Sequence, residues 1–268
     1  MVRLTRTVRF SINPAAVRER GFPVVRKRNG YGGAPSMSGL GAYYEFDVTC
    51  AGEIDPRLGF FVNIKDIDDA TRRSAIPLLA DAVAGAAGNA RPESLLPRLF
   101  EAIDRELDRA DAMDLVWRLT PFLSYALEDR EMSACVVRQD FEFAASHRLH
   151  SASLSPSENK AVFGKCNWEN GHGHNYRLRV GALTPTDADS PGFDLDSLER
   201  VVDETIIERF DHRHLNKDCE EFADLNPSVE NIAKVCFELL QPALADAGLR
   251  LHEVTVWETE KTSCVYRG

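Results

Sequence analysis

The sequence predicts an α+β fold built from two units, each with the element order ββααββ. Alternating polar and apolar residues, typical of half-buried strands, occur in two pairs in each half of the chain. Between these pairs, each half carries two stretches with the helical repeat of apolar residues. Because the same order appears twice, we expect one domain at residues 1–131 and a second at residues 132–268.

The first half shows its elements in order along the chain. Pro92 suits the start of the second helix, because a first-turn residue has no N–H bond to lose. The expected elements are strands at residues 2–12 and 43–50, helices at about 63–85 and 92–109, and strands at 115–119 and 122–127.

The second half repeats the order, and Pro227 is expected in the first turn of its second helix. The strands before the helices flank a loop that carries most of the polar motifs. The expected elements are strands at residues 133–149 and 172–183, helices at about 194–209 and 227–245, and strands at 250–259 and 262–267.

Composition limits the class of protein. The chain has 44% hydrophobic and 28% charged residues and a formal net charge of −10, so nucleic acid is an unexpected partner. Residues 1–131 hold 18 Lys and Arg against 19 Asp and Glu, whereas residues 132–268 hold 14 against 23. No apolar run approaches the roughly 20 residues that span a bilayer, and the start lacks a signal-peptide core. Six Cys without paired spacing predict reduced thiols and a cytoplasmic location.

Histidines concentrate the chemistry in the second half, where all seven lie at or beyond residue 147. His172 and His174 are two residues apart, so on a strand both imidazoles face the same side. His147 ends an alternating stretch upstream. Three imidazoles with no evident fourth protein ligand are typical of a catalytic zinc site, which keeps one position open.

The motifs of residues 141–268 resemble those of the 6-pyruvoyltetrahydropterin synthase and 6-carboxytetrahydropterin synthase family, the T-fold pterin enzymes. Several short motifs occur in the family's order, which makes the resemblance specific. They are Ser146-His147-Arg148-Leu149-His150-Ser151, Gly164-Lys165-Cys166-Asn167, Asn170-Gly171-His172-Gly173-His174-Asn175-Tyr176, Asp211-His212, Pro227-Ser228 with Glu230-Asn231, Glu258-Thr259 and Val265-Tyr266-Arg267-Gly268.

The resemblance implies an activity that spacing alone does not. It implies a carbon–oxygen lyase acting on phosphates, which converts 7,8-dihydroneopterin triphosphate to 6-pyruvoyltetrahydropterin and releases triphosphate. Zn²⁺ is the implied cofactor, with His147, His172 and His174 as its ligands. The metal would bind the side-chain hydroxyls of the substrate and acidify neighbouring bonds.

The remaining roles also come from the resemblance. Cys166 is the implied general base, and a nearby zinc ion and Lys165 would favour its thiolate. Asp211 and His212 form the implied proton relay. Glu258 is the implied pterin anchor, since a carboxylate accepts two hydrogen bonds from the ring. Ser228 and Glu230 are expected either to frame the pterin pocket or to cap the helix; His214 is expected to be structural.

The first half carries a weaker echo of the family in Gly52-Glu53-Ile54-Asp55-Pro56 with Gly59 and Val62-Asn63, without the site motifs. We therefore interpret residues 1–131 as a degenerate copy without a metal site. The basic stretch Arg26-Lys27-Arg28 is interpreted as a solvated connection, with contact to a phosphate-bearing ligand as the alternative.

Two other functions stay open. The first is 6-carboxytetrahydropterin synthase of the queuosine route; Asn226-Pro227-Ser228 resembles that type, whereas the five residues between Cys166 and His172 favour the pyruvoyl type. The second is a catalytically silent zinc- or pterin-binding scaffold, against which Cys166, Asp211, His212 and Glu258 argue.

Assembly is a further expectation. Four-stranded antiparallel sheets with helices on one face leave their edges open. T-fold units are joined edge to edge into barrels, so we expect a homo-oligomer, with three tandem chains giving six units. The expected partners are the pterin triphosphate and other copies of the chain, with neither nucleic acid nor membrane.

Overall fold

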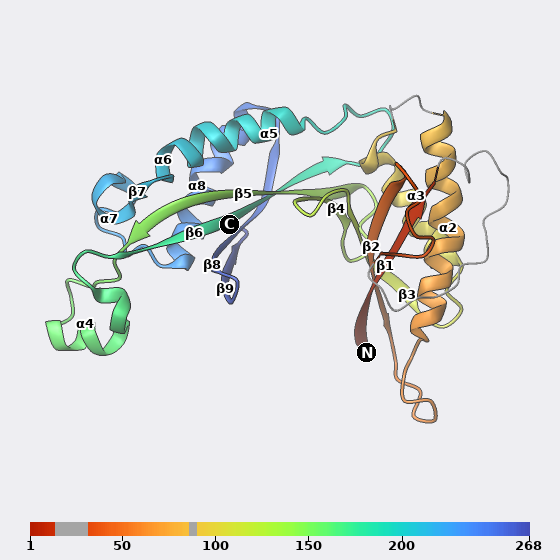
Figure 1. Ribbon diagram of the computed structural model, residues 1–268, viewed down its shortest axis with the longest axis horizontal. Helices are drawn as coiled ribbons and strands as arrows, with labels where there is room; N and C mark the ends of the chain where they lie inside the picture. Colours follow the sequence, from red (N-terminus) through yellow and green to blue (C-terminus); the bar gives the residue numbers. More distant parts are fainter. Residues whose placement is uncertain (14–31, 86–89) are drawn as a thin grey trace. The chain divides into compact units, whose positions relative to one another are not determined.

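A computed structural model describes residues 1–13, 32–85 and 90–268 (Figure 1). It separates into two compact units: Met1–Val137 with Thr184–Gly192, and Arg138–Leu183 with Phe193–Gly268. The mixed helix and antiparallel-sheet fold expected from the sequence is confirmed. The basic stretch Arg26-Lys27-Arg28 lies outside the described residues.

The first unit is a sheet with the strand order β1-β2-β3-β4, in which each neighbouring pair is antiparallel. Two helices connect β2 to β3 and lie on one face of the sheet (Figure 1). The elements are β1 (Val2–Ile12), β2 (Ala42–Gly52), α2 (Ile64–Gly85), α3 (Pro92–Arg105), β3 (Asp111–Arg118) and β4 (Leu123–Leu127).

Aromatic side chains fill the buried face of this first sheet. The Phe10 ring stacks on Tyr44 and Phe46 with centroids 5.6 and 5.9 Å apart, and Phe46 stacks on Trp117 at 5.5 Å. Each of these four side chains is less than 9% exposed. This part of the face is therefore packed with aromatic side chains.

The second unit holds most of β5 (Ala134–His147) and of β6 (His172–Pro185), followed in the sheet by β8 (Arg250–Thr259) and β9 (Thr262–Tyr266). The β6–β8 and β8–β9 pairs are antiparallel, and the short β7 (Arg213–His214) runs parallel to β5. The chain between β6 and β8 forms α5 (Leu195–Val202), α6 (Glu208–Phe210), α7 (Leu215–Asp218) and α8 (Val229–Asp246).

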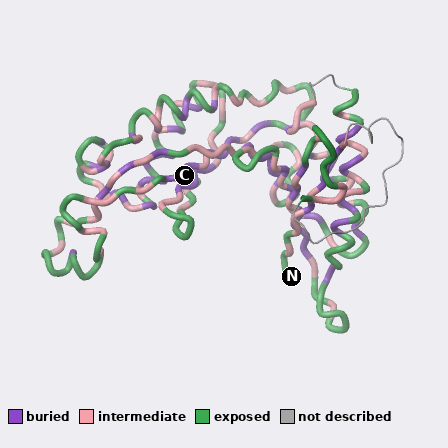
Figure 2. The backbone as a smooth tube through the Cα atoms, viewed as in Figure 1, coloured by how far each residue is buried: buried purple, intermediate pink, exposed green. Residues whose placement is uncertain are grey.

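The core of the second unit lies between the sheet and these helices. Phe143 and Ala145 of β5 alternate toward the same side as Tyr176 and Leu178 of β6. They pack with buried residues of α8, and Figure 2 shows the buried positions alternating along β5 and β6. Burial of this face fixes which side of each strand meets the helices, and so where the residues just beyond the core must point.

Three details differ from the sequence-based expectations. The helix expected at residues 194–209 is interrupted by a π-helical turn, Asp203–Ile207. Pro227 precedes the first turn of α8, because Ser228 is the N-cap. A helix, α4 (Pro156–Phe163), occupies the loop after β5; Ser155 and Glu158 form a reciprocal capping box at its start.

In the described part of the chain, no helix is both long enough and apolar enough to cross a bilayer.

Candidate functional site

Three imidazoles meet just beyond the core of the second unit. His147 is the last residue of β5, and His172 and His174 begin β6, on the face that also carries Phe143 and Tyr176. One ring nitrogen from each His lies within 4.8 Å of the others. His147 is fully buried, and the His174 side chain is 19% exposed. The alternation that builds the core thus also directs these three rings to one place.

The tautomer of His147 follows from its neighbour. Nδ1 lies 2.7 Å from the Pro227 carbonyl oxygen, which can only accept, so Nδ1 carries the proton and donates it. Nε2 of neutral His147 therefore presents a lone pair toward His172 Nε2, 3.2 Å away. Two nitrogens bound to one tetrahedral zinc ion are separated by about 3.3 Å, given bonds of about 2.0–2.1 Å. The observed separation matches that value.

The protonation states also suit a metal. Burial lowers the pKa of His147 and of His174 and so favours the neutral form of each ring, which is the form that binds a metal. His174 Nε2 is buried without a hydrogen-bonding partner. Buried nitrogens without partners are costly, and a cation near the convergent lone pairs would remove much of that cost. The donor set fits a zinc ion.

Gly171 permits the close approach of the two strands. Its φ is +72°, a region that L side chains rarely adopt. A Cβ at this position would lie 2.6 Å from the His147 carbonyl oxygen and 3.0 Å from His214 Nε2. The glycine directly before His172 is therefore required for the position of both His147 and His172.

Glu258 reaches the imidazoles from β8. Its Oε1 lies 3.4 Å from His147 Nε2 and 3.8 Å from His174 Nε2. The Glu258 side chain is 21% exposed and is thus only partly buried. The structure thus brings Glu258 together with the three His.

Cys166 and Tyr176 flank the His172–His174 pair in the sequence. Cys166 lies in a 3-10 turn, Gly164–Asn167, whose backbone is held by the Leu149 N–H donating to the Cys166 carbonyl at 2.8 Å. The Tyr176 ring meets the His174 ring edge-on, with centroids 5.5 Å apart. Burial raises the pKa of Tyr176, and the charges of Glu258 and Cys166 raise it further.

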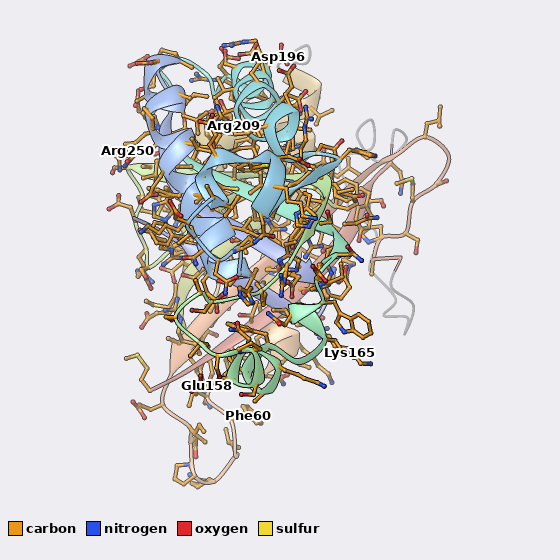
Figure 3. The ribbon with its side chains drawn as sticks, turned by 90° about the vertical axis from the view of Figure 1, so that its left-hand side faces the viewer. Phe60, Glu158, Lys165, Asp196, Arg209 and Arg250 are labelled. Atoms are coloured by element: carbon orange, nitrogen blue, oxygen red, sulfur yellow. The ribbon has the colours of Figure 1, made fainter. Side chains whose placement is uncertain are left out.

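Lys165 directly precedes Cys166 in the sequence. Figure 3 shows Lys165 at the same end of the second unit as Glu158 and away from Asp196. Lys165 is exposed. The thiol therefore has a cationic neighbour in sequence that projects into solvent.

Asp211 and His212 contact each other directly. Asp211 Oδ2 lies 2.7 Å from His212 Nδ1, and Asp211 Oδ1 accepts a 2.7 Å hydrogen bond from the Ala144 N–H. The Ala144 N–H first, and then His212, lower the pKa of Asp211. The His212 side chain is 83% exposed and lines an open cleft of about 520 Å³ together with His174. Among the described residues, no hydrogen bond or ion pair joins this pair to Cys166.

Ser228 and Glu230 serve the helix. Ser228 Oγ accepts from the Asn231 N–H at the start of α8, and a hydrogen bond from Ser228 is the first cause of the lowered pKa of Glu230. Ser228 is thus the N-cap of α8, and Glu230 is an acidic residue of its first turn. The contribution of both residues to a pterin pocket stays a prediction.

Two residues of the site had no assigned role in the sequence analysis. Tyr176 lies two positions after His174, so its side of the strand could have been inferred from alternation. Pro227 supplies a backbone carbonyl 80 residues from His147, and no local pattern signals that contact.

Comparison with known proteins assigns the second half to a family. The sequence model described as 6-pyruvoyl tetrahydropterin synthase matches residues 136–268. A "putative 6-pyruvoyl tetrahydrobiopterin synthase" of Caenorhabditis elegans is 41% identical over 129 residues, 47% of this chain and 89% of that protein. The 6-pyruvoyl tetrahydrobiopterin synthase of Homo sapiens is 40% identical over 135 residues, 49% of this chain and 90% of that protein.

A solved structure, that of the 6-pyruvoyl tetrahydropterin synthase of Caenorhabditis elegans, has 38% sequence identity, covers 50% of this chain and 96% of that chain, and has a TM-score of 0.47. The sequence identity to these two proteins, over most of their length, is sufficient to assign the family. The chain belongs to the 6-pyruvoyl tetrahydropterin synthase family.

Proposed function

We propose that this chain catalyses the zinc-dependent conversion of 7,8-dihydroneopterin triphosphate to 6-pyruvoyltetrahydropterin with release of triphosphate, as a carbon–oxygen lyase. The observation that carries the proposal is the convergence of three imidazole nitrogens within 4.8 Å, with the Glu258 carboxylate beside them. Family membership supports the substrate class. The polar groups lie on one unit, in the region that the family shares.

His147, His172 and His174 would hold the zinc ion. When bound, zinc acts as a Lewis acid that acidifies bonds next to the side-chain hydroxyls of the substrate. The Pro227 carbonyl keeps the proton of His147 on Nδ1, and so keeps the Nε2 lone pair directed into the site. The three rings are carried by neighbouring strands of one sheet, and such a scaffold lowers the cost of ordering the site.

Cys166 and the Asp211–His212 pair would move protons. We assign to Cys166 Sγ the removal of a proton from the substrate side chain, which only its thiolate can perform. Asp211 accepts from His212 Nδ1 and leaves Nε2 exposed in the cleft. Nε2 can then take up or release a proton at the substrate.

Glu258 would fix the pterin ring. A carboxylate accepts two parallel hydrogen bonds from a ring N–H and an exocyclic amino group, which sets both the position and the orientation of the ring. Its half-buried position supports this role, because a carboxylate in such a place gains from a bidentate partner.

The decisive experiment is turnover of 7,8-dihydroneopterin triphosphate by zinc-loaded protein, with the products separated and identified. A pyruvoyl product supports the proposal. A carboxy product with acetaldehyde would assign the chain to the 6-carboxytetrahydropterin type, which the Asn226-Pro227-Ser228 run favours. Absence of any product from protein that binds zinc would leave the scaffold function.

We also propose that the chain forms a homo-oligomer, with three chains as the favoured number. The sheet of each unit ends in an edge strand, β1 in the first and β9 in the second. Open edges favour pairing with another chain. Part of β1 is covered, since the Ser11 N–H donates to the Pro35 carbonyl at 2.8 Å, so the remainder is the part available for pairing. A monomer by light scattering at micromolar concentration would contradict this proposal. The cytoplasmic location likewise stays a prediction.

A further inference from the structure

The contacts of Glu258 join atoms that cannot hydrogen-bond to each other. His147 Nδ1 carries the ring proton because it donates to the Pro227 carbonyl, so Nε2 of the neutral ring is a lone pair. Glu258 Oε1, itself only an acceptor when ionised, lies 3.4 Å from that Nε2. Two such atoms repel each other in a buried place unless a proton or a cation lies between them.

A proton alone does not account for the arrangement. His147 Nε2 faces two groups at once, His172 Nε2 at 3.2 Å and Glu258 Oε1 at 3.4 Å. His174 Nε2, also without a hydrogen-bonding partner, lies 3.8 Å from the same carboxylate oxygen. One proton can bridge two of these four atoms, whereas a metal ion can be shared by all of them.

The separations are close to those between ligands of a single metal ion. Ligand atoms at the corners of a tetrahedral zinc site lie about 3.3 Å apart. The separations in this site are 3.2, 3.4 and 3.8 Å, and the longest is the one between Glu258 Oε1 and His174 Nε2. Glu258 Oε1 is therefore as close to His147 Nε2 and His174 Nε2 as a further ligand of the same ion would be.

We propose that, before pterin binds, the Glu258 carboxylate completes the coordination of the zinc ion held by the three His, and that pterin binding draws the carboxylate away from the ion. This inference rests on the proposed function, which assigns the three rings to zinc and Glu258 to pterin. A single carboxylate would thus connect ring recognition to access to the metal. A molecule without a pterin ring would leave Glu258 bound to the zinc ion. The exchange would therefore select substrates by their ring.

The test measures zinc affinity of the full chain by competition with a chromophoric chelator. Removing the charge in Glu258→Gln should weaken zinc binding by about 10- to 100-fold, the usual effect of losing a group that supports a metal site. Glu260→Gln is the matched control, because Glu260 follows two residues later and is exposed. That variant should bind zinc as the parent chain does.

A second measurement needs no substitution. Unsubstituted pterin has the ring but no side chain that could replace the carboxylate on the metal. If it takes Glu258 from zinc, saturating pterin should weaken zinc affinity of the parent chain, and zinc should weaken pterin affinity by the same factor. Equal or stronger zinc binding in the presence of bound pterin would overturn the exchange.

The two proposals fail in different ways. If the parent chain binds zinc and Glu258→Gln binds it equally well, Glu258 is not a ligand, and the proposed enzymatic function still stands. If the parent chain binds no zinc at all, the proposed function fails and this inference fails with it.

Discussion

Asp211 and His212 are adjacent in sequence, yet their side chains hydrogen-bond to each other, with 2.7 Å between Oδ2 and Nδ1. Neighbouring side chains on a strand point to opposite sides, so the contact needs an unusual backbone. His212 has a φ of +58°, and its N–H donates to the Ala144 carbonyl at 2.6 Å. The backbone is thus held in a left-handed conformation that turns the ring back onto the carboxylate. Such strain at a polar pair is typical of functional sites.

Replacement of Asp211 by Asn tests the relay. The amide keeps the size of the side chain but cannot stabilise a positively charged His212 ring. We expect kcat to fall about 100-fold or more, within the range that a positioned acid–base group contributes, while zinc content stays unchanged. Asp246→Asn, an exposed carboxylate at the end of α8, is the control and should retain parent activity. Equal kcat values for the two variants would remove Asp211 from the mechanism.

Cys166 can be tested against another accessible thiol. Cys166 and Cys264 are the two cysteines of intermediate exposure, and the other four are buried. Cys166→Ala should abolish turnover and leave the zinc stoichiometry at one ion per chain, since the thiol is assigned to proton removal and not to the metal. Cys264→Ala should keep most of the activity. Loss of zinc from Cys166→Ala, measured by elemental analysis, would instead identify Cys166 as a metal ligand.

Some parts of the site could be predicted from the sequence, and others could not. His172 and His174 must share a face of β6 because they are two residues apart, and the apolar alternation of β5 directs His147 to the same face. Glu258 ends the apolar run of β8, the strand next to β6. The convergence of these four side chains thus follows from strand periodicity together with strand order.

Other parts depend on the path of the chain. The bond between His147 and the Pro227 carbonyl spans 80 residues, and a backbone acceptor leaves no mark on the sequence. The positive φ of His212 could not be predicted from the sequence either, because only Gly is a reliable signal of left-handed backbone. Helix α4 was missed because Pro156–Phe163 has little amphipathic pattern, although Ser155 and Glu158 spell a capping box.

Gly171 offers a test of metal geometry with an internal control. Gly171→Ala imposes both an unfavourable φ and a Cβ 2.6 Å from the His147 carbonyl oxygen. Gly248→Ala imposes a similar φ, +76°, with no heavy atom within 4 Å of the new Cβ. Both variants should lose about 1–2 kcal/mol of unfolding free energy from the backbone term. Only Gly171→Ala should also bind zinc more weakly, as measured by chelator competition; equal zinc affinity in the two variants would show that the strand approach is unimportant for the metal.

Glu253 should make the stability of the second unit depend on pH. The carboxylate is 3% exposed and accepts from Arg138 Nε at 2.7 Å and Arg267 Nε at 2.9 Å. Burial alone would raise the pKa of Glu253, but the two arginines outweigh it and leave that pKa below its ordinary value. The folded state therefore binds this proton less readily than the unfolded state, whose pKa is about 4.3.

The sign of the effect follows from that difference. A depressed carboxyl pKa contributes stability that is fully present above the unfolded pKa and is lost as pH falls through the folded pKa. Glu253→Gln should therefore cost about 3 kcal/mol in urea unfolding at pH 7, since it removes one partner of a buried ion pair. Below about pH 4 the parent chain loses the same contribution, so the difference between the two proteins should shrink. Glu260→Gln, at an exposed position, should show no such convergence. A difference between parent and Glu253→Gln that stays constant from pH 7 to the acid limb would mean that the ion pairs do not set this stability.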